Sequence, residues 1–328
     1  MNSAEGRMQR LRSGCKINIF LHLLNRRPDG YHELFSLFLP LDAPFDEMIV
    51  REKEGEGFHF RCNVPDIDPE RNTVAKAWRL YGEATGFTPA LDVELVKGVP
   101  HGAGLGGGSA DAAEMLLYLE RRNPRPAGKE TLHSLAARIG ADVPFFLEKR
   151  PCLVEGIGEK LTPLSPESPW LASLVGSWGV LVCPAVHVDT AWAYAAWDKA
   201  HPEVFSADDL PEKSEEGGKR ELNALTDAAE ADKNHCSVFF PPLRVENGFE
   251  SVVFGRWPEL AKLKALLLRE GAFAAGMSGS GSSLFGFFPD VETAQGFMAR
   301  VQEFDDACAT YGPFRPVLSS PAPLPPAG

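Results

Sequence analysis

Cysteine is scarce in this chain, and its spacing excludes the sites that cysteine usually builds. The six cysteines are far apart in 328 residues and contain no C-x-x-C pair. A disulfide framework or a zinc site needs clustered spacing, so we expect reduced, buried thiols in a cytoplasmic protein. They are Cys15, Cys62, Cys152, Cys183, Cys236 and Cys308.

Basic residues and long apolar runs are lacking as well. The 33 basic residues are outnumbered by 45 acidic ones, whereas binding to a nucleic-acid backbone needs a basic face. No window approaches the ~20 uninterrupted apolar residues of a membrane helix. The first 14 residues lack the apolar core of a signal peptide. We therefore expect a cytoplasmic protein without nucleic-acid or membrane partners, whose polyanionic ligand is a small phosphorylated molecule.

The periodic segments predict an α+β protein, and its length favours two domains. Alternation over residues 15–23 predicts a half-buried strand in which Lys16, Asn18 and Phe20 share one face. Further strands are expected at residues 33–41, 46–53, 57–62, 91–96, 152–156, 178–183, 272–277 and 284–288. Helices are expected at residues 73–85, 109–122, 130–139, 258–270 and 290–303.

Breaks in this pattern indicate how the chain is divided. The segment 155–175 interrupts the periodicity, so we expect an N-terminal domain over residues 1–160 and a C-terminal domain over residues 161–312. Within the second domain, the charged stretch 202–240 indicates a surface insertion. The proline-rich residues 313–328 predict an extended tail.

A glycine-rich run, PHGAGLGGGSADAA at residues 100–113, lies between an expected strand and a helix with Ser109 as its N-cap. Such a backbone can approach a ligand closely, and a helix N-terminus attracts anions. A plain flexible turn is disfavoured between two periodic elements. A G-x-G-x-x-G match at residues 102–107 keeps a dinucleotide site open, whereas a Walker A loop is excluded because no Gly-Lys-Ser/Thr follows. The run alone predicts a phosphate site of undetermined class.

Three further features are candidates for chemistry, each with a plainer alternative. Lys16 and Asn18, ~6.6 Å apart on one strand face, could steer a phosphate or lie at a solvated edge. Asp142, bordered by apolar residues, is either a partnered buried acid or a helix cap, and the residues leave both open. The glycine–serine run at 276–288 is either a tight turn or a second polar wall of a cleft.

With these blocks in view, the chain resembles the GHMP superfamily of small-molecule kinases over about residues 14–312. The resemblance is carried by KINIFLHLLNRRPDGYHELFSLF at 16–38, the glycine run at 100–113, GADVPFF at 140–146 and GMSGSGSSLF at 276–285. The first block is similar to that of the superfamily branch acting on 4-diphosphocytidyl-2-C-methyl-D-erythritol, in non-mevalonate isoprenoid synthesis. The branch would phosphorylate the C2 hydroxyl, giving the 2-phosphate and ADP.

The resemblance also implies a fold, a cofactor and partners. The fold would be the two-domain GHMP kinase fold, with a ribosomal-protein-S5-domain-2-like ATP domain and a C-terminal ferredoxin-like α/β sandwich domain. ATP with Mg²⁺ would supply the phosphoryl group, and the partner would be a small-molecule substrate. The protein would be a monomer or a weak homodimer.

Roles for single residues follow from the resemblance alone. Asp142 would be the general base, and Lys16 would keep it ionised and stabilise charge during transfer. Asn72 would lie near the adenine. The phosphates would be wrapped by Pro100, His101, Gly102, Ala103, Gly104, Leu105, Gly106, Gly107, Gly108, Ser109 and Ala110. The substrate would contact Asn18, Tyr31, His32, Phe38, Thr190 and Tyr194, with Tyr31 stacked on cytosine.

Two departures and two alternatives qualify this interpretation. Ala110 replaces the second serine of the family loop, so any hydroxyl ligand for the metal would be Ser109. The family's Asn-Asp-Leu-Glu is Asn-Gly-Phe-Glu at residues 247–250. The alternatives are another GHMP kinase, such as a mevalonate or homoserine kinase, and an inactive nucleotide-binding regulator. The RRPDGYHE block argues against the first, and the presence of Lys16 and Asp142 argues against the second.

Overall fold

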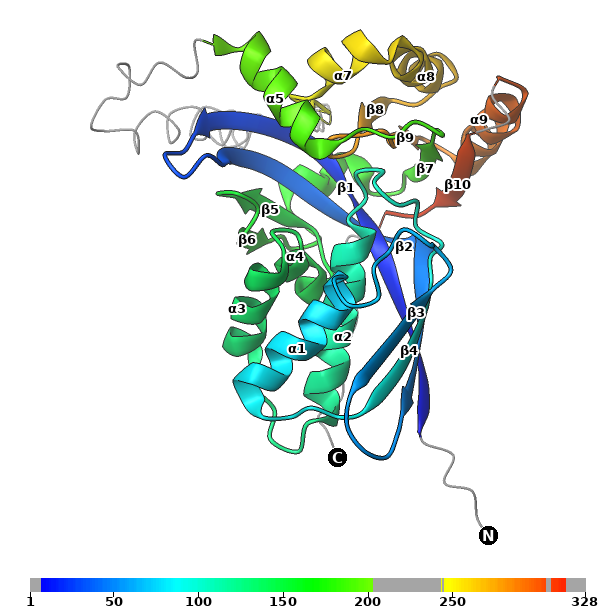
Figure 1. Ribbon diagram of the computed structural model, residues 1–328. Coiled ribbons are helices and arrows are strands. Elements are labelled where there is room, and N and C mark those ends of the chain that lie inside the picture. The colour runs from blue at the N-terminus through cyan, green and yellow to red at the C-terminus, as the bar shows by residue number, and fades with distance from the viewer. Residues whose placement is uncertain (1–6, 203–242, 244, 305–307, 317–328) are drawn as a thin grey trace.

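Two β-sheets, each with helices packed on one face, build the molecule, and a long strand pair of the first sheet runs up to the second (Figure 1). The computed structural model describes residues 7–202, 243, 245–304 and 308–316. All but one residue of the predicted insertion 202–240, and the predicted tail from residue 317 onward, lie outside the described residues.

The first sheet has the strand order β3-β4-β2-β5-β6, with β1 paired to β2. Only β3 and β4 are parallel within it. The strands are β1 (Met8–Arg26), β2 (His32–Glu52), β3 (Phe58–Cys62), β4 (Leu91–Val96), β5 (Cys152–Glu155) and β6 (Lys160–Pro163). The expected strands 33–41 and 46–53 are one strand, because β2 pairs with β1 on both sides of an irregularity between Leu41 and Asp46.

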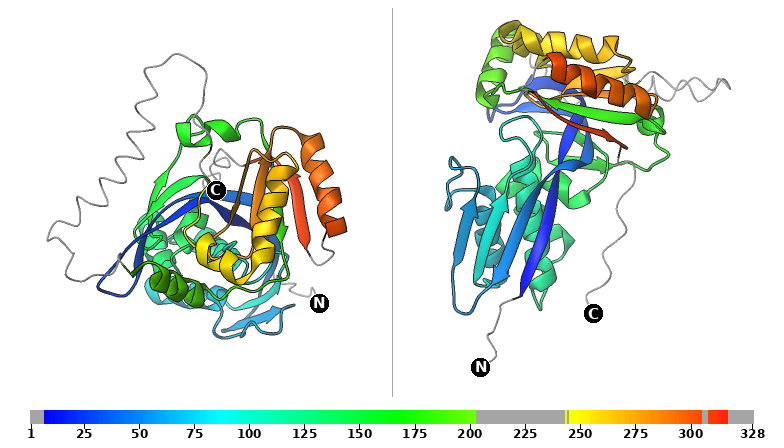
Figure 2. Two further views of the ribbon diagram at one scale, coloured as in Figure 1. Left: turned by 90° about the horizontal axis from the view of Figure 1, so that it is seen from above. Right: turned by 90° about the vertical axis from the view of Figure 1, so that its right-hand side faces the viewer.

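Four helices, α1 to α4, cover one face of this sheet. In the right-hand view of Figure 2, helices lie behind the strands of this sheet. Asn72 caps α1 (Thr73–Thr85) by accepting from Ala75 N, and the left-handed Gly86 ends it, as predicted. The predicted start of α2 (Gly107–Arg122) is wrong, because the left-handed Gly106 holds the N-cap position and Ser109 is already helical. After α3 (Lys129–Ile139), a short helix that the sequence did not predict follows, α4 (Val143–Glu148).

The second sheet has the order β10-β7-β9-β8 and is antiparallel throughout. Its strands are β7 (Trp178–Cys183), β8 (Ala274–Met277), β9 (Leu284–Phe288) and β10 (Ala309–Phe314). The helices are α5 (Thr190–Ala200), α7 (Glu250–Arg256), α8 (Pro258–Arg269) and α9 (Val291–Phe304), and a 3₁₀ turn, η1 (Pro169–Leu174), precedes β7. This order of strands and helices is the expected ferredoxin-like arrangement. The expected tail begins too early, because Pro313 and Phe314 belong to β10.

The β1–β2 ribbon is buried on both faces, and a bulge decides which side chains point where. Asn18 lies opposite Phe38 and Phe20 lies opposite Leu37, so Ile19 is an extra residue in β1. Ile17, Ile19 and Phe20 therefore all pack in the cluster that contains Leu181 and Phe285 of the second sheet. The prediction that Phe20 shares a face with Lys16 is wrong, because plain alternation ends at this bulge.

The cysteines and the lengths of the helices bear on the expectations for thiols and membrane spans. Cys15, Cys152 and Cys183 are buried free thiols, whereas Cys236 lies outside the described part of the chain. Burial raises the pKa of Cys152 to about 12, with the charge of Glu148 adding to the effect. Across the same described residues, every helix is too short or too polar to cross a membrane.

Candidate active site

The glycine loop between β4 and α2 takes a backbone course that only glycine tolerates at its centre. Gly102, Gly104 and Gly106 have φ values of 66°, 76° and 71°. A Cβ on Gly104 would lie 2.2 Å from the carbonyl oxygen of Ser278, so a side chain there would also collide with the second domain. On the other side, the N–H of Lys16 donates to the Leu105 carbonyl at 2.9 Å, which ties the loop to β1.

The N-terminus of α2 completes this wall. Its N-cap residue, Gly106, makes no side-chain cap bond, so the first amides of the helix are left to other acceptors. Thr73, at the start of α1, donates its hydroxyl to the Gly108 carbonyl at 2.7 Å and brings a second helix N-terminus close by. Uncapped helix amides beside a glycine backbone form an anion site.

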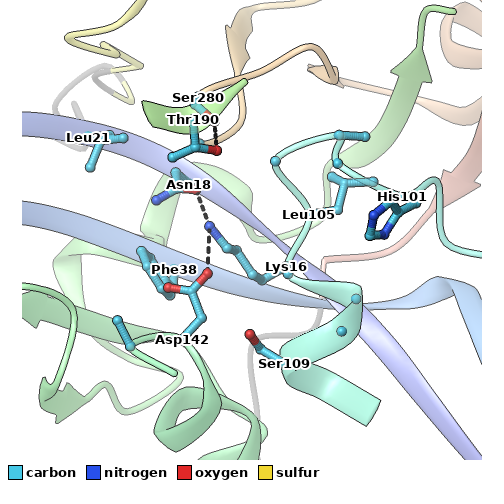
Figure 3. Close-up of a pocket in the computed structure, with 18 of the residues that line it drawn as sticks. Lys16, Asn18, Leu21, Phe38, His101, Leu105, Ser109, Asp142, Thr190 and Ser280 are labelled. Atoms are coloured by element: carbon cyan, nitrogen blue, oxygen red, sulfur yellow. Dashed lines mark hydrogen bonds and ion pairs between the residues drawn. The ribbon is translucent and has the colours of Figure 1, made fainter. Parts of the chain in front are cut away.

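Lys16, Asn18 and Asp142 converge opposite the loop (Figure 3). The Lys16 Nζ lies 2.6 Å from the Asn18 Oδ1 and 3.6 Å from the Asp142 Oδ2. The Lys16 side chain is 5 % exposed and that of Asp142 is 32 % exposed. The ammonium also lies 4.4 Å from the centre of the Phe38 ring. A buried ammonium needs such partners, and Asp142 remains open to a ligand.

The surroundings of Asp142 distinguish a partnered acid from a helix cap, the two alternatives that the sequence left open. Asp142 holds the N-cap position of α4 but makes no side-chain cap bond there. Its carboxylate instead faces Lys16 across the cleft. It is therefore a partnered acid at a ligand-accessible position.

The predicted second polar wall lies against the glycine loop. The Ser278 hydroxyl donates to the Gly104 carbonyl at 2.9 Å and accepts from the Asn18 N–H at 3.2 Å. The hydroxyls of Ser280 and Thr190 are 2.9 Å apart (Figure 3). Asn247 fixes this turn, because its Nδ2 donates to the carbonyls of Met277 and Gly279 at 2.7 and 2.8 Å.

An aromatic cluster closes the other end of the cleft. Tyr194 of α5 stacks on His32 with ring centres 5.1 Å apart and meets Phe249 edge-on at 4.8 Å. Burial raises the pKa of Tyr194 to about 12, with a smaller contribution from the negative charge of Asp142. The His32 Nε2 lies 2.7 Å from the Asp198 Oδ1, one turn further along α5.

These elements enclose a cleft of about 400 Å³, and most predicted site residues line it. The predicted residues in its wall are Lys16, Asn18, Phe38, all of residues 100–109, Asp142, Thr190 and Tyr194. The predicted residues outside its wall are Asn72, Tyr31, His32 and Ala110. Asn72 is occupied as the α1 cap, His32 lies behind Tyr194, and Ala110 is buried in α2, while Tyr31 is 60 % exposed.

Other lining residues were missed as site residues by the sequence analysis. Lys97 immediately precedes the loop and Thr73 follows a helix cap, so position along the chain was a usable signal for these two. Gly279 and Ser280 belong to the predicted polar run. The remaining ones are Leu21 and Leu34 of the block 16–38, Ala141 of the block 140–146, Phe249 of the Asn-Gly-Phe-Glu segment, and Ile157, whose segment carries no motif.

Comparison with known proteins places this geometry in a class. The model of the GHMP kinases N terminal domain matches residues 72–150, and the GHMP kinases C terminal model matches residues 229–307. A crystal structure of homoserine kinase from Cytophaga hutchinsonii shares the fold, with a TM-score of 0.61, 19 % identity and coverage of 94 % of this chain and 95 % of that one. The protein is a GHMP kinase with the expected two-domain α+β fold.

Two further relatives narrow the class. The 4-diphosphocytidyl-2-C-methyl-D-erythritol kinase of Nitratidesulfovibrio vulgaris (strain DP4) is 49 % identical over 295 residues, covering 90 % of this chain and 95 % of that protein. A crystal structure of 4-(cytidine 5'-diphospho)-2C-methyl-D-erythritol kinase is 31 % identical, has a TM-score of 0.68 and covers 92 % and 98 % of the two chains. The chain belongs to the family of 4-diphosphocytidyl-2-C-methyl-D-erythritol kinases.

Proposed function

We propose that the protein transfers the γ-phosphoryl group of ATP to the C2 hydroxyl of 4-diphosphocytidyl-2-C-methyl-D-erythritol. The products would be the 2-phosphate and ADP, in the non-mevalonate route to isoprenoid precursors. Membership of the GHMP kinases implies the use of ATP. The observation that carries the proposal is the pairing of Lys16 with Asp142 at 3.6 Å, in the same cleft as the glycine loop.

Lys16 and Asp142 would align the acceptor hydroxyl and stabilise the charge of the transferring group. Asp142 would accept a hydrogen bond from the hydroxyl and orient it toward the γ-phosphate. Its carboxylate is held opposite the Lys16 ammonium at 3.6 Å, so orientation of the hydroxyl is the larger part of its role. Lys16, held by the Asn18 Oδ1, has its ammonium fixed where negative charge would develop.

The glycine loop and the start of α2 would hold the triphosphate through backbone N–H groups. Mg²⁺ fits the same place, because it prefers oxygen ligands and commonly keeps waters and substrate phosphates among them. The described residues contain no group of three or more histidine, cysteine or acidic side chains that could hold a metal by themselves. The cation would therefore rely on phosphate oxygens and on the Ser109 hydroxyl, and would neutralise phosphate charge.

The aromatic end of the cleft would bind the acceptor. Asn18, Phe38, Thr190 and Tyr194 line the wall there, and His32 supports the Tyr194 ring from behind. Tyr31, exposed at the neighbouring turn, would stack on the cytosine. Asn72 would lie near the adenine end through the α1 N-terminus.

The organisation of the protein is part of the same proposal. We assign the ATP domain to residues 1–160 and the second domain to residues 161–314, so that it includes all of β10, with the insertion as predicted and the tail after β10. A cytoplasmic monomer or weak homodimer, without nucleic-acid or membrane partners, completes the assignment.

A direct assay tests the proposed reaction. Purified protein is incubated with Mg-ATP and one candidate alcohol at a time, and ADP release is followed. We expect turnover with the cytidylyl substrate and none with mevalonate or homoserine. Turnover of mevalonate or homoserine and not of the cytidylyl substrate would place the protein in another branch of the superfamily. ATP binding without any turnover would indicate a nucleotide-binding regulator.

A further inference from the structure

A buried carboxylate outside the proposed mechanism, that of Asp46 on β2, lies behind the glycine loop. Its side chain is 0 % exposed. The Asp46 Oδ1 accepts hydrogen bonds from the backbone N–H of Gly98 at 2.7 Å and of Val99 at 2.8 Å. These two residues lead directly into Pro100, so one carboxylate oxygen fixes the segment that enters the loop.

The other oxygen of Asp46 faces the point where the loop ends. A Cβ on Gly107, the first residue of α2, would lie 3.3 Å from the Asp46 Oδ2 and 3.0 Å from the Val99 Cγ1. A side chain at Gly107 would have little room, so the start of α2 lies close to Asp46 and to Val99, which precedes the loop. The two ends of the glycine loop thus lie around the carboxylate of Asp46.

Lys97 fastens this junction to α2. Its Nζ contacts the Asp46 Oδ2 and lies 2.9 Å from the Asp111 Oδ2. Ser13 of β1 donates to the other Asp111 oxygen at 2.5 Å. Burial lowers the pKa of Lys97, but the charges of Asp111 and Asp46 outweigh it and raise the pKa overall. Lys97 lines the cleft, yet its charge is committed to two carboxylates, so it holds the loop in place and is not a phosphate ligand.

We propose that Asp46 is a positioning residue of the nucleotide site, which holds both ends of the glycine loop and so forms the phosphate cradle before ATP binds. A preformed loop does not have to be ordered when its ligand arrives, and this favours affinity. The inference rests on the proposed function for the identity of the nucleotide. It concerns nucleotide binding alone and is independent of the alcohol that is phosphorylated.

The variant Asp46→Asn tests the inference with little change in volume. It keeps one oxygen acceptor but places an NH₂ group against the backbone amides or the Lys97 ammonium. We expect the dissociation constant of a non-hydrolysable ATP analogue and the KM for ATP to rise about tenfold, while kcat at saturating ATP and the KM for the alcohol change less than about threefold. A merely structural role would lower the folded fraction, and so the apparent kcat, at unchanged KM.

Asp92→Asn is the matched control. Asp92 is a buried carboxylate of β4 in the same sheet, paired with Lys53 at 3.2 Å and Arg61 at 3.5 Å, and it does not line the cleft. We expect this variant to bind the ATP analogue as the wild type does. Unchanged ATP affinity in Asp46→Asn, or an equal loss in Asp92→Asn, would overturn the inference.

Hydrogen exchange of the wild-type protein tests the same idea without a substitution. The amides of Gly98 and Val99 should exchange slowly in the nucleotide-free protein and change little when the ATP analogue is added. Fast exchange that slows only with the analogue would show that ATP orders the loop and that Asp46 does not. Slow exchange in a protein that binds no ATP analogue would leave the loop anchor intact and remove the proposed function.

Discussion

The two walls of the cleft recognise their ligands by different means. The glycine loop and the start of α2 present backbone, with left-handed glycines where side chains cannot fit. The opposite wall, from the β1–β2 ribbon and α5, presents side chains such as Asn18, Phe38 and Tyr194. In the proposed reaction, backbone amides would bind the charge and shape that all nucleoside triphosphates share, whereas side chains would distinguish one alcohol from another. Donor binding and acceptor choice would then be encoded in separate segments of the chain.

The largest effect is expected where the two walls meet, at Asp142. Asp142→Asn should reduce turnover by about a thousandfold, because a neutral amide neither pairs with the Lys16 ammonium nor orients the acceptor hydroxyl as the carboxylate does. ATP binding should be kept, since the loop is untouched. Steady-state kinetics and calorimetry with an ATP analogue check both statements, with the exposed Asp66→Asn as a control. Near-normal activity would remove Asp142 from the mechanism.

Among changes to the backbone wall, substitution of Gly104 should disturb the glycine loop most directly. Gly104→Ala should lower kcat/KM for ATP by about a hundredfold, because its Cβ would meet the Ser278 carbonyl at 2.2 Å and displace the loop. Gly86→Ala is the matched control, since Gly86 has nearly the same φ, 74°, with no atom within 4 Å of the added Cβ. It shares the conformational cost of about 1–2 kcal/mol without the collision. Equal losses of kcat/KM in both variants would show that the strain of a left-handed alanine, and not the collision with Ser278, lowers the activity.

A substitution in the side-chain wall should change the KM for the alcohol and not the KM for ATP. Tyr194→Ala should raise the KM for the alcohol about tenfold and leave the KM for ATP unchanged, because the ring carries the contacts with His32 and Phe249. Tyr194→Phe keeps the ring and should remain close to the wild type. Initial-rate measurements with each substrate varied in turn distinguish the two constants. A change confined to the KM for ATP would contradict the division between the walls.

The smallest effect is expected far from both walls, at Glu52. Arg122 donates to its carboxylate, and mainly for this reason the pKa of Glu52 lies below its ordinary value. A depressed folded-state pKa stabilises the fold above the unfolded pKa, and this contribution is lost as the pH falls. Glu52→Gln should therefore cost about 1 kcal/mol at pH 7, after allowance for partial exposure, and almost nothing near pH 3. Urea unfolding at both pH values measures it, and both KM values should be unchanged.

Much of the fold could be predicted because its signals are local. The strands at 91–96, 178–183 and 284–288 are short apolar runs bounded by turn residues, and their predicted ends agree with β4, β7 and β9. The helix α1 begins and ends at its own capping residues, Asn72 and Gly86. The start of α2 could not be predicted, because the space beside the left-handed Gly106 is limited by residues far away in the chain: a Cβ there would lie 3.0 Å from the Phe146 ring and 3.3 Å from the Lys16 Cγ.

The sequence segments that build the site could be predicted, but the contacts between them could not. Sequence patterns identified the glycine loop and the polar run at 276–288, but not that Ser278 bonds to Gly104. The approach of Lys16 to Asp142 depends on the packing of α4 against α2 and, through Phe145, against Phe38 of β2, and α4 itself was not predicted. Phe249 lines the cleft from the Asn-Gly-Phe-Glu segment, which was identified as a departure from the family motif and not as part of the site.

The bulge at Ile19 fixes the length of this stretch of β1. A substitution leaves each neighbouring side chain on the face that it already has, whereas a change in length does not. Deleting one residue here would restore plain alternation and turn either Asn18 or Phe20 to the opposite face. A library of insertions and deletions should therefore tolerate no change of length here, because such a change would move the cleft-facing side chain of Asn18 or the core-facing side chain of Phe20.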